Sequence, residues 1–183
     1  MATTTLLEFL SGYGHVNDPA SADRLKHLVR PPTWVRPRKA FIYVYGDPIL
    51  AVMSLYRRGY AQIQARRNGR ISTRPIPETV DDYARQGIDN LRLTRHLESW
   101  LHISGERPLV FVDSRRVWDN GSTLLGILGL DPSQLTFPER RPRASDLGVL
   151  SERTKRSLMS LYENYYALAE ELPPVLGRSC DSA

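Results

Sequence analysis

Two wholly apolar runs, Ala40–Tyr45 and Leu109–Val112, constrain the fold of this chain more than any other feature of its sequence. Both runs are rich in β-branched and aromatic residues, which favour strands. Neither run alternates with polar residues, as a strand with one solvated face would. We therefore predict two buried parallel strands, at Phe41–Tyr45 and Leu109–Val112, with the first as a central strand.

Helices are predicted around these strands. Asp47 and Pro48 directly follow the first run and match the N-cap and the first position of a helix. Apolar residues three and four positions apart predict further helices at 6–13, 93–101, 121–129 and 158–172. Strands alternating with helices are typical of an α/β fold, so we predict a three-layer domain with a parallel sheet flanked by helices.

Length and composition fit one domain, because the chain has 183 residues, of which 41% are hydrophobic and 25% charged. We predict a single domain over 1–176 and a frayed tail over 177–183. No apolar run reaches the roughly 20 residues of a membrane helix, and the first residues lack the basic segment of a signal peptide. A cytoplasmic protein without membrane contact is expected. Cys180 is the only cysteine, which excludes an internal disulfide.

The net charge is +5, and most of the positive side chains are Arg. Arg binds phosphate, sulfate or carboxylate through two parallel hydrogen bonds, so an anionic partner is favoured. Two Arg-rich stretches, 66–74 and 140–143, are the candidate surfaces; a solvated basic face is the alternative for any single Arg. Nucleic acid is the poorest choice of partner, because the basic groups are scattered and no nucleic-acid-binding signature is present.

Several segments resemble the sulfotransferase family, which uses 3′-phosphoadenosine 5′-phosphosulfate as donor. Ser54 follows Gly46 by eight positions, the spacing between the Arg and the Ser of the family's 3′-phosphate-binding segment. Lys26-His27, followed by Pro31-Pro32, resembles the segment with the family's catalytic His. Three further segments resemble the family's central helix, late strand and small helix in the same order, at 96–101, 108–119 and 124–130.

This resemblance implies a P-loop-like fold and transfer of a sulfuryl group to a hydroxyl or amine of a small molecule or glycan. The reaction needs a cradle for the 5′-phosphosulfate, an anchor for the 3′-phosphate and a base for the acceptor proton. The donor nucleotide is the implied cofactor, and no metal is implied.

The implied cradle is at Thr3, Thr4 and Thr5, whose alternative role is to cap the first helix. In the family a strand and a loop with glycine and lysine precede this position, and the sequence shows neither. The chain is therefore similar to an amino-terminally truncated or degenerate member, which lacks most of the first strand and loop.

The implied anchor is Ser54, with Gly46 at the position where the family has Arg. Arg57 and Arg58 on the same predicted helix are possible substitutes; the alternative is a Ser packed on its helix beside two solvated Arg. The implied base is His27, which follows its lysine by one residue where the family has two. An ordinary surface or core histidine is the alternative there.

We therefore expect a sulfotransferase-like protein with little or no transfer activity. A non-catalytic anion- or protein-binding module with an Arg-rich surface is the alternative. Restoring the charge with Gly46→Arg is expected to tighten nucleotide binding by roughly tenfold, without restoring transfer. Transfer also requires the lysine-bearing loop to stabilise charge on the departing bisphosphate.

Overall fold

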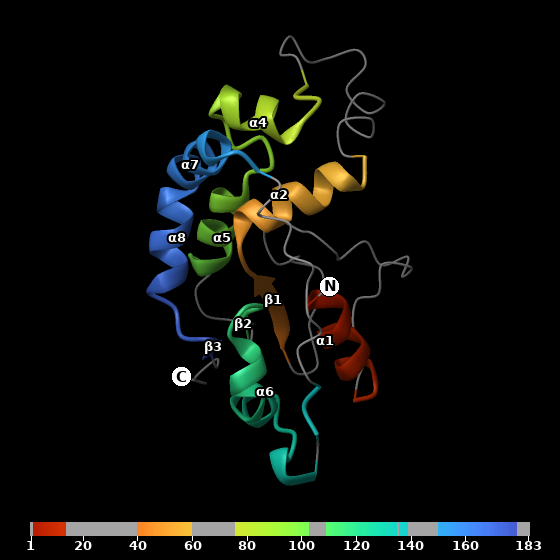
Figure 1. Ribbon diagram of the computed structural model, residues 1–183. Coiled ribbons are helices and arrows are strands. Elements are labelled where there is room, and N and C mark those ends of the chain that lie inside the picture. Colours follow the sequence, from red (N-terminus) through yellow and green to blue (C-terminus); the bar gives the residue numbers. More distant parts are fainter. Residues whose placement is uncertain are drawn as a thin grey trace, which may run out of the picture. The chain divides into compact units, whose positions relative to one another are not determined.

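The computed structural model describes residues 2–13, 40–59, 76–102, 109–134, 136–138 and 150–178 (Figure 1). These residues belong to two compact units. The first, called the sheet unit, comprises Met1–Gly46, Arg95–Arg143 and Leu168–Ala183. The second, called the helical unit, comprises Asp47–Thr94 and Ala144–Ala167.

The sheet unit contains a three-stranded sheet with the order β1-β2-β3. Strand β1 (Phe41–Tyr45) pairs in parallel with β2 (Leu109–Asp113), so that Phe41 lies opposite Leu109 and Tyr45 opposite Asp113. This confirms the two strands, their parallel pairing and the general α/β class. All five residues of β2 are buried, whereas most of β1 is half-buried. Among the described strands, β2 rather than β1 is therefore the central one.

Strand β3 (Val175–Arg178) runs antiparallel to β2, so the described sheet is mixed rather than wholly parallel. The predicted tail boundary at 177 is wrong here, because Gly177 and Arg178 pair with Val110 and Leu109. A Cβ atom on Gly177 would lie 2.8 Å from Cγ2 of Ile127, so the absence of a side chain lets a helix approach this strand closely.

Helices pack against both faces of the sheet, since alternate strand residues point to opposite faces. On one face, Leu6 and Leu10 of α1 (Ala2–Ser11) form a core with Val110 and Val112. The short helices η1 (Val117–Asn120), α6 (Gly121–Ile127) and η2 (Pro132–Gln134) follow β2. On the other face lie Tyr43, Phe111 and Trp100, and the Trp100 ring stacks on that of Tyr43 with a centroid distance of 4.9 Å.

Trp100 belongs to α5 (Leu93–Leu101), whose predicted bounds are confirmed. The predicted first helix and the helix at 121–129 are also present, as α1 and α6, with ends that differ by a few residues.

The helical unit contains α2 (Pro48–Arg57), α4 (Val80–Gln86), α7 (Glu152–Leu161) and the first part of α8 (Glu163–Glu170). The single helix predicted over 158–172 is wrong, because two helices meet at Tyr162. The Tyr162 side chain is fully buried, and its hydroxyl lies 2.7 Å from that of Tyr83 on α4.

Both tyrosine hydroxyls also lie within hydrogen-bond distance of Asp89 Oδ1, at 3.2 Å from Tyr83 and 3.1 Å from Tyr162. The other carboxylate oxygen of Asp89 accepts from the Thr94 N–H at 3.1 Å. Burial is the main cause that raises the pKa of both tyrosines, so they stay protonated. This network joins α4 to the junction of α7 and α8.

In the described part of the chain, every helix is too short or too polar to cross a lipid bilayer.

Candidate functional site

The turn after β1 positions the start of α2 through Asp47. Its Oδ1 atom accepts hydrogen bonds from the N–H groups of Ile49 at 2.8 Å and Leu50 at 3.3 Å. The Tyr166 hydroxyl donates to the same oxygen at 3.1 Å. The predicted N-cap at Asp47 and first position at Pro48 are therefore confirmed. Because the Asp47 carboxylate already accepts from two N–H groups of this helix start, these groups do not form an open anion cradle.

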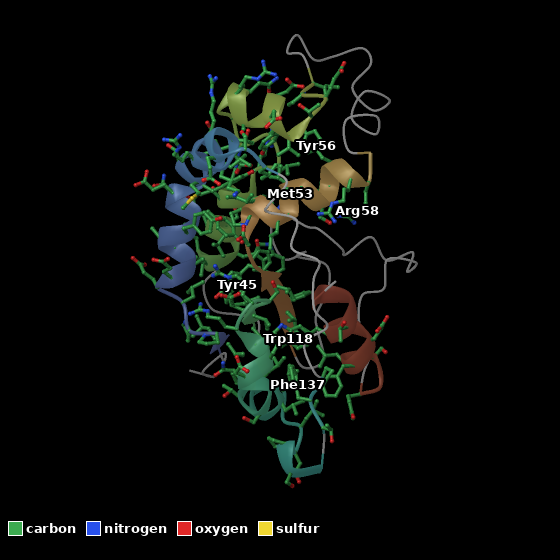
Figure 2. All side chains as sticks on the ribbon, viewed as in Figure 1. Tyr45, Met53, Tyr56, Arg58, Trp118 and Phe137 are labelled. Atoms are coloured by element: carbon green, nitrogen blue, oxygen red, sulfur yellow. The ribbon has the colours of Figure 1, made fainter. Side chains whose placement is uncertain are left out.

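The predicted phosphate anchor Ser54 lies in the middle of α2 and is half-buried. Arg57 and Arg58 are exposed at the end of the helix, where Figure 2 shows Arg58. Arg58 lies close to Ser54 in the structure. The contact is with the main chain of Ser54, because Arg58 Nε donates a hydrogen bond to the Ser54 carbonyl oxygen at 3.1 Å. This bond helps to end the helix.

Gly46 lies at the carboxyl end of β1, beside the carboxyl end of β2. The Ser114 N–H donates to the Tyr45 carbonyl oxygen at 2.8 Å and holds the two strand ends together. A Cβ atom on Gly46 would come closer than 3.0 Å to Ser114 Oγ, a separation that real Cβ atoms essentially never show. The Ser114 hydroxyl thus occupies the space that a side chain at position 46 needs.

Asp113, the last residue of β2, is a fully buried carboxylate held by two arginines. Arg115 binds both carboxylate oxygens, from Nε at 3.1 Å and from a terminal nitrogen at 2.9 Å. Arg116 Nε donates to Oδ2 at 2.7 Å. Burial by itself raises the pKa of Asp113, but hydrogen bonds from Arg115 and then Arg116 outweigh it, and the pKa is lowered. Asp113 thus forms ion pairs with both Arg115 and Arg116.

The same cluster fixes the segment that leads into β3. Arg116 also donates to the carbonyl oxygens of Ala169 at 3.3 Å and Leu172 at 2.9 Å. The Asp113 N–H donates to the Pro174 carbonyl oxygen at 2.9 Å. Asp113 and Arg116 therefore have a structural role at the strand end, where ligands of α/β proteins commonly bind.

The three threonines of the implied cradle lie inside α1, which begins at Ala2. The alternative N-cap role is therefore wrong for Thr3, Thr4 and Thr5, because an N-cap precedes the first helical residue. Thr5 is buried at 6% exposure, and its hydroxyl has no hydrogen-bond partner within the described ranges.

Other predicted site residues lie outside the described residues. These are His27 and the Arg-rich stretches 66–74 and 140–143. Among the residues that are described, no group of three or more His, Cys, Asp or Glu side chains could hold a metal ion.

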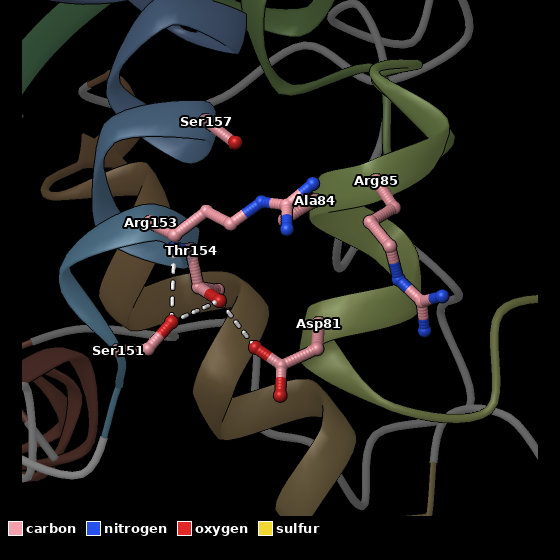
Figure 3. Close-up of a pocket in the computed structure, with 7 residues that line it drawn as sticks. All are labelled: Asp81, Ala84, Arg85, Ser151, Arg153, Thr154 and Ser157. Atoms are coloured by element: carbon pink, nitrogen blue, oxygen red, sulfur yellow. Dashed lines mark hydrogen bonds between the residues drawn. The ribbon is translucent and has the colours of Figure 1, made fainter.

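The sequence predictions include neither the contact of Ser114 with Gly46 nor a polar pocket between α4 and α7 (Figure 3). Ser114 follows an apolar run, and only the pairing of β1 with β2 brings it to Gly46. For the pocket a signal exists, since Arg153 and Ser157 are four residues apart and therefore share one side of a helix.

Comparison of the chain with protein-family models, with curated proteins and with solved structures yields no match.

Proposed function

We propose that the chain is a sulfotransferase-like protein that binds a 3′-phosphorylated adenosine nucleotide weakly and transfers little or no sulfuryl group. The observation that carries this proposal is the segment in which β1, paired in parallel with β2, leads through Gly46 into the capped helix α2 with Ser54. This is the order of strand, turn and helix that the resemblance implies, and ligands of parallel sheets bind beyond the carboxyl ends of the strands.

Helices on both faces of the sheet support the three-layer, P-loop-like core that the proposal includes. A cytoplasmic location and a small-molecule or glycan acceptor belong to the same proposal. No step of the proposed reaction requires a metal.

Weak binding follows from the charges near the strand ends. Position 46 carries no cation, and the Ser114 hydroxyl occupies the space that a cationic side chain at position 46 would need. Asp113 offsets much of the charge of Arg115 and Arg116. A neutral hydroxyl such as that of Ser54 binds phosphate less strongly than a hydroxyl paired with a guanidinium.

In the proposed transfer, an acceptor oxygen attacks sulfur, a new S–O bond forms, and the S–O bond to the bisphosphate breaks. The acceptor proton goes to a base, which the resemblance implies is His27, and adenosine 3′,5′-bisphosphate leaves with the bonding electrons. Stabilising the leaving oxygen requires a cation that is in place in the transition state. At the strand ends that the structure describes, Arg115 and Arg116 are engaged by Asp113, so we propose nucleotide binding with little turnover.

The experiment is a product assay with labelled donor and a mixture of phenolic, amine and sugar acceptors. We expect no more sulfated product from the wild-type chain than from Ser54→Ala. Clearly more sulfated product from the wild-type chain than from Ser54→Ala would show that the chain is an active enzyme. That result would contradict the proposal that it transfers little or no sulfuryl group.

A second candidate is the non-catalytic anion- or protein-binding module. The observation that favours it is the set of exposed arginines among the described residues of the helical unit, at Arg57, Arg58, Arg85, Arg92, Arg153 and Arg156. Such a module would bind different polyanions similarly, with strong dependence on salt, and would show no preference for the bisphosphate. Nucleic acid stays the least supported partner.

A further inference from the structure

A polar pocket with a volume of about 200 Å³ lies between α4 and α7 in the helical unit (Figure 3). Apart from Ala84, its lining consists of polar or charged residues from or next to the two helices. Ser54 does not line it, so it is separate from the proposed nucleotide anchor. Its volume is below the roughly 300–1,000 Å³ of pockets that bury a whole small molecule, so it suits a single small group.

One end of the pocket is a hydrogen-bonded chain that is already satisfied. Ser151 caps α7 by accepting the Thr154 N–H at 3.1 Å, and the two hydroxyls lie 2.8 Å apart. The Thr154 hydroxyl donates to the Asp81 carboxylate of α4. This chain ties the two helices together and engages the one carboxylate in the pocket lining.

The remaining polar groups are donors, and two of them are cationic. The Arg153 side chain extends from α7 toward Ala84 of α4, and Ser157 lies one turn further along α7 (Figure 3). Arg85 completes the set from α4 and is paired with Asp82, which is not part of the lining. In the ranges that the structure describes, Arg153 pairs with no carboxylate. The lining residues thus include two arginines and one carboxylate, and the Arg153 guanidinium is the one that extends across the pocket (Figure 3).

We propose that this pocket binds a phosphate group, as free phosphate or as the phosphate of a small monoester. A guanidinium fork matches two oxygens of a phosphate group, and the Ser157 hydroxyl can donate to a third. The pocket accepts one tetrahedral oxyanion but is too small to bury a complete nucleotide. This site is independent of the proposed sulfotransferase-like function.

The test is a calorimetric titration of the full chain with inorganic phosphate and, in a second arm, with O-phosphoserine. Arg153→Gln is expected to weaken phosphate binding by about tenfold or more, because a charge-assisted hydrogen bond is lost. Arg156→Gln is the matched control, since Arg156 is exposed on the same helix, bonds its own helix at Glu152 and does not line the pocket. This control is expected to bind as the wild-type chain does. Tighter binding in one arm identifies the free or the esterified form as the ligand.

A second measurement does not depend on how the variants fold. In the wild-type chain, phosphate is expected to shift the backbone amide NMR signals of Ala84 and Ser157 more than those at the far end of α7. Three results would overturn the proposal: no saturable phosphate binding, equal losses in Arg153→Gln and Arg156→Gln, or amide shifts spread over the whole surface.

Discussion

The contact between Ser114 and Gly46 predicts that a side chain at position 46 is costly only while Ser114 keeps its hydroxyl. A Cβ atom on Gly46 overlaps Ser114 Oγ but lies 3.6 Å from Ser114 Cβ, which is an ordinary contact. The clash is therefore with the hydroxyl alone. Gly46 is not among the glycines with positive φ, so its backbone accepts other residues without strain.

The magnitude follows from two opposing effects. Forcing an extra group into a packed site costs about 1–3 kcal/mol, and rotation of the small Ser114 side chain places Gly46→Ala near the lower end. A compatible Gly→Ala change otherwise stabilises a protein by about 0.4–1 kcal/mol, because it restricts the unfolded chain. We expect Gly46→Ala to destabilise the wild-type chain by about 1 kcal/mol, and to stabilise the Ser114→Gly background by about 0.5 kcal/mol.

The assay is urea unfolding of the four proteins of this double-mutant cycle, followed by circular dichroism. The expected coupling between the two positions is about 1.5 kcal/mol, well above the roughly 0.3–0.5 kcal/mol within which distant sites add. Additive effects of the two substitutions would refute the steric argument. For the same steric reason, Gly46→Arg should tighten bisphosphate binding more when Ser114→Gly accompanies it than when it is made alone.

Three further predictions concern stability. Asp113→Asn should lower the free energy of unfolding by about 3 kcal/mol, because it leaves two arginines around an uncharged buried group. Since the pKa of Asp113 is lowered on folding, the stabilisation by its carboxylate is present above about pH 4 and is lost as the pH falls through the pKa of the folded state. This pH-dependent loss should be missing from acid-unfolding curves of the variant. The raised pKa values of Tyr83 and Tyr162 predict the opposite pH dependence, in which their contribution to stability is full below about pH 10 and falls as the pH rises further. Tyr162→Phe should lower the free energy of unfolding by about 1 kcal/mol at pH 7 and reduce the loss of stability at alkaline pH. Thermal unfolding measured across pH tests both effects. Asp47→Ala should cost about 1 kcal/mol through loss of the cap on α2, while Asp47→Asn should retain most of the stability in the same urea assay.

Features with a local cause were predictable from the sequence. The two apolar runs specify β1 and β2 because continuous burial leaves a continuous apolar pattern. Asp47 and Pro48 specify the start of α2 because the cap bonds only to the next few residues. The start of helix α4 could also have been predicted, since Thr79 and Asp82 form a capping box whose spacing is visible in the sequence.

Features that depend on distant partners were not predictable in this way. Strand β3 has only four residues, and its pairing with β2 decides its conformation. The boundary between α7 and α8 falls at Tyr162, whose hydroxyl meets Tyr83, far away in the sequence. The steric overlap between a side chain at position 46 and the Ser114 hydroxyl arises only when β1 and β2 are paired.

The central claim of a weakened nucleotide site is tested most directly by calorimetric titration of the full chain with adenosine 3′,5′-bisphosphate. We expect weak, saturable binding that Ser54→Ala reduces by about tenfold, since a hydrogen bond to a charged phosphate is lost. Ser160→Ala is a suitable control, because Ser160 is an exposed helical serine on α7. Absence of binding, or equal affinity of the wild-type chain and Ser54→Ala, would contradict the account.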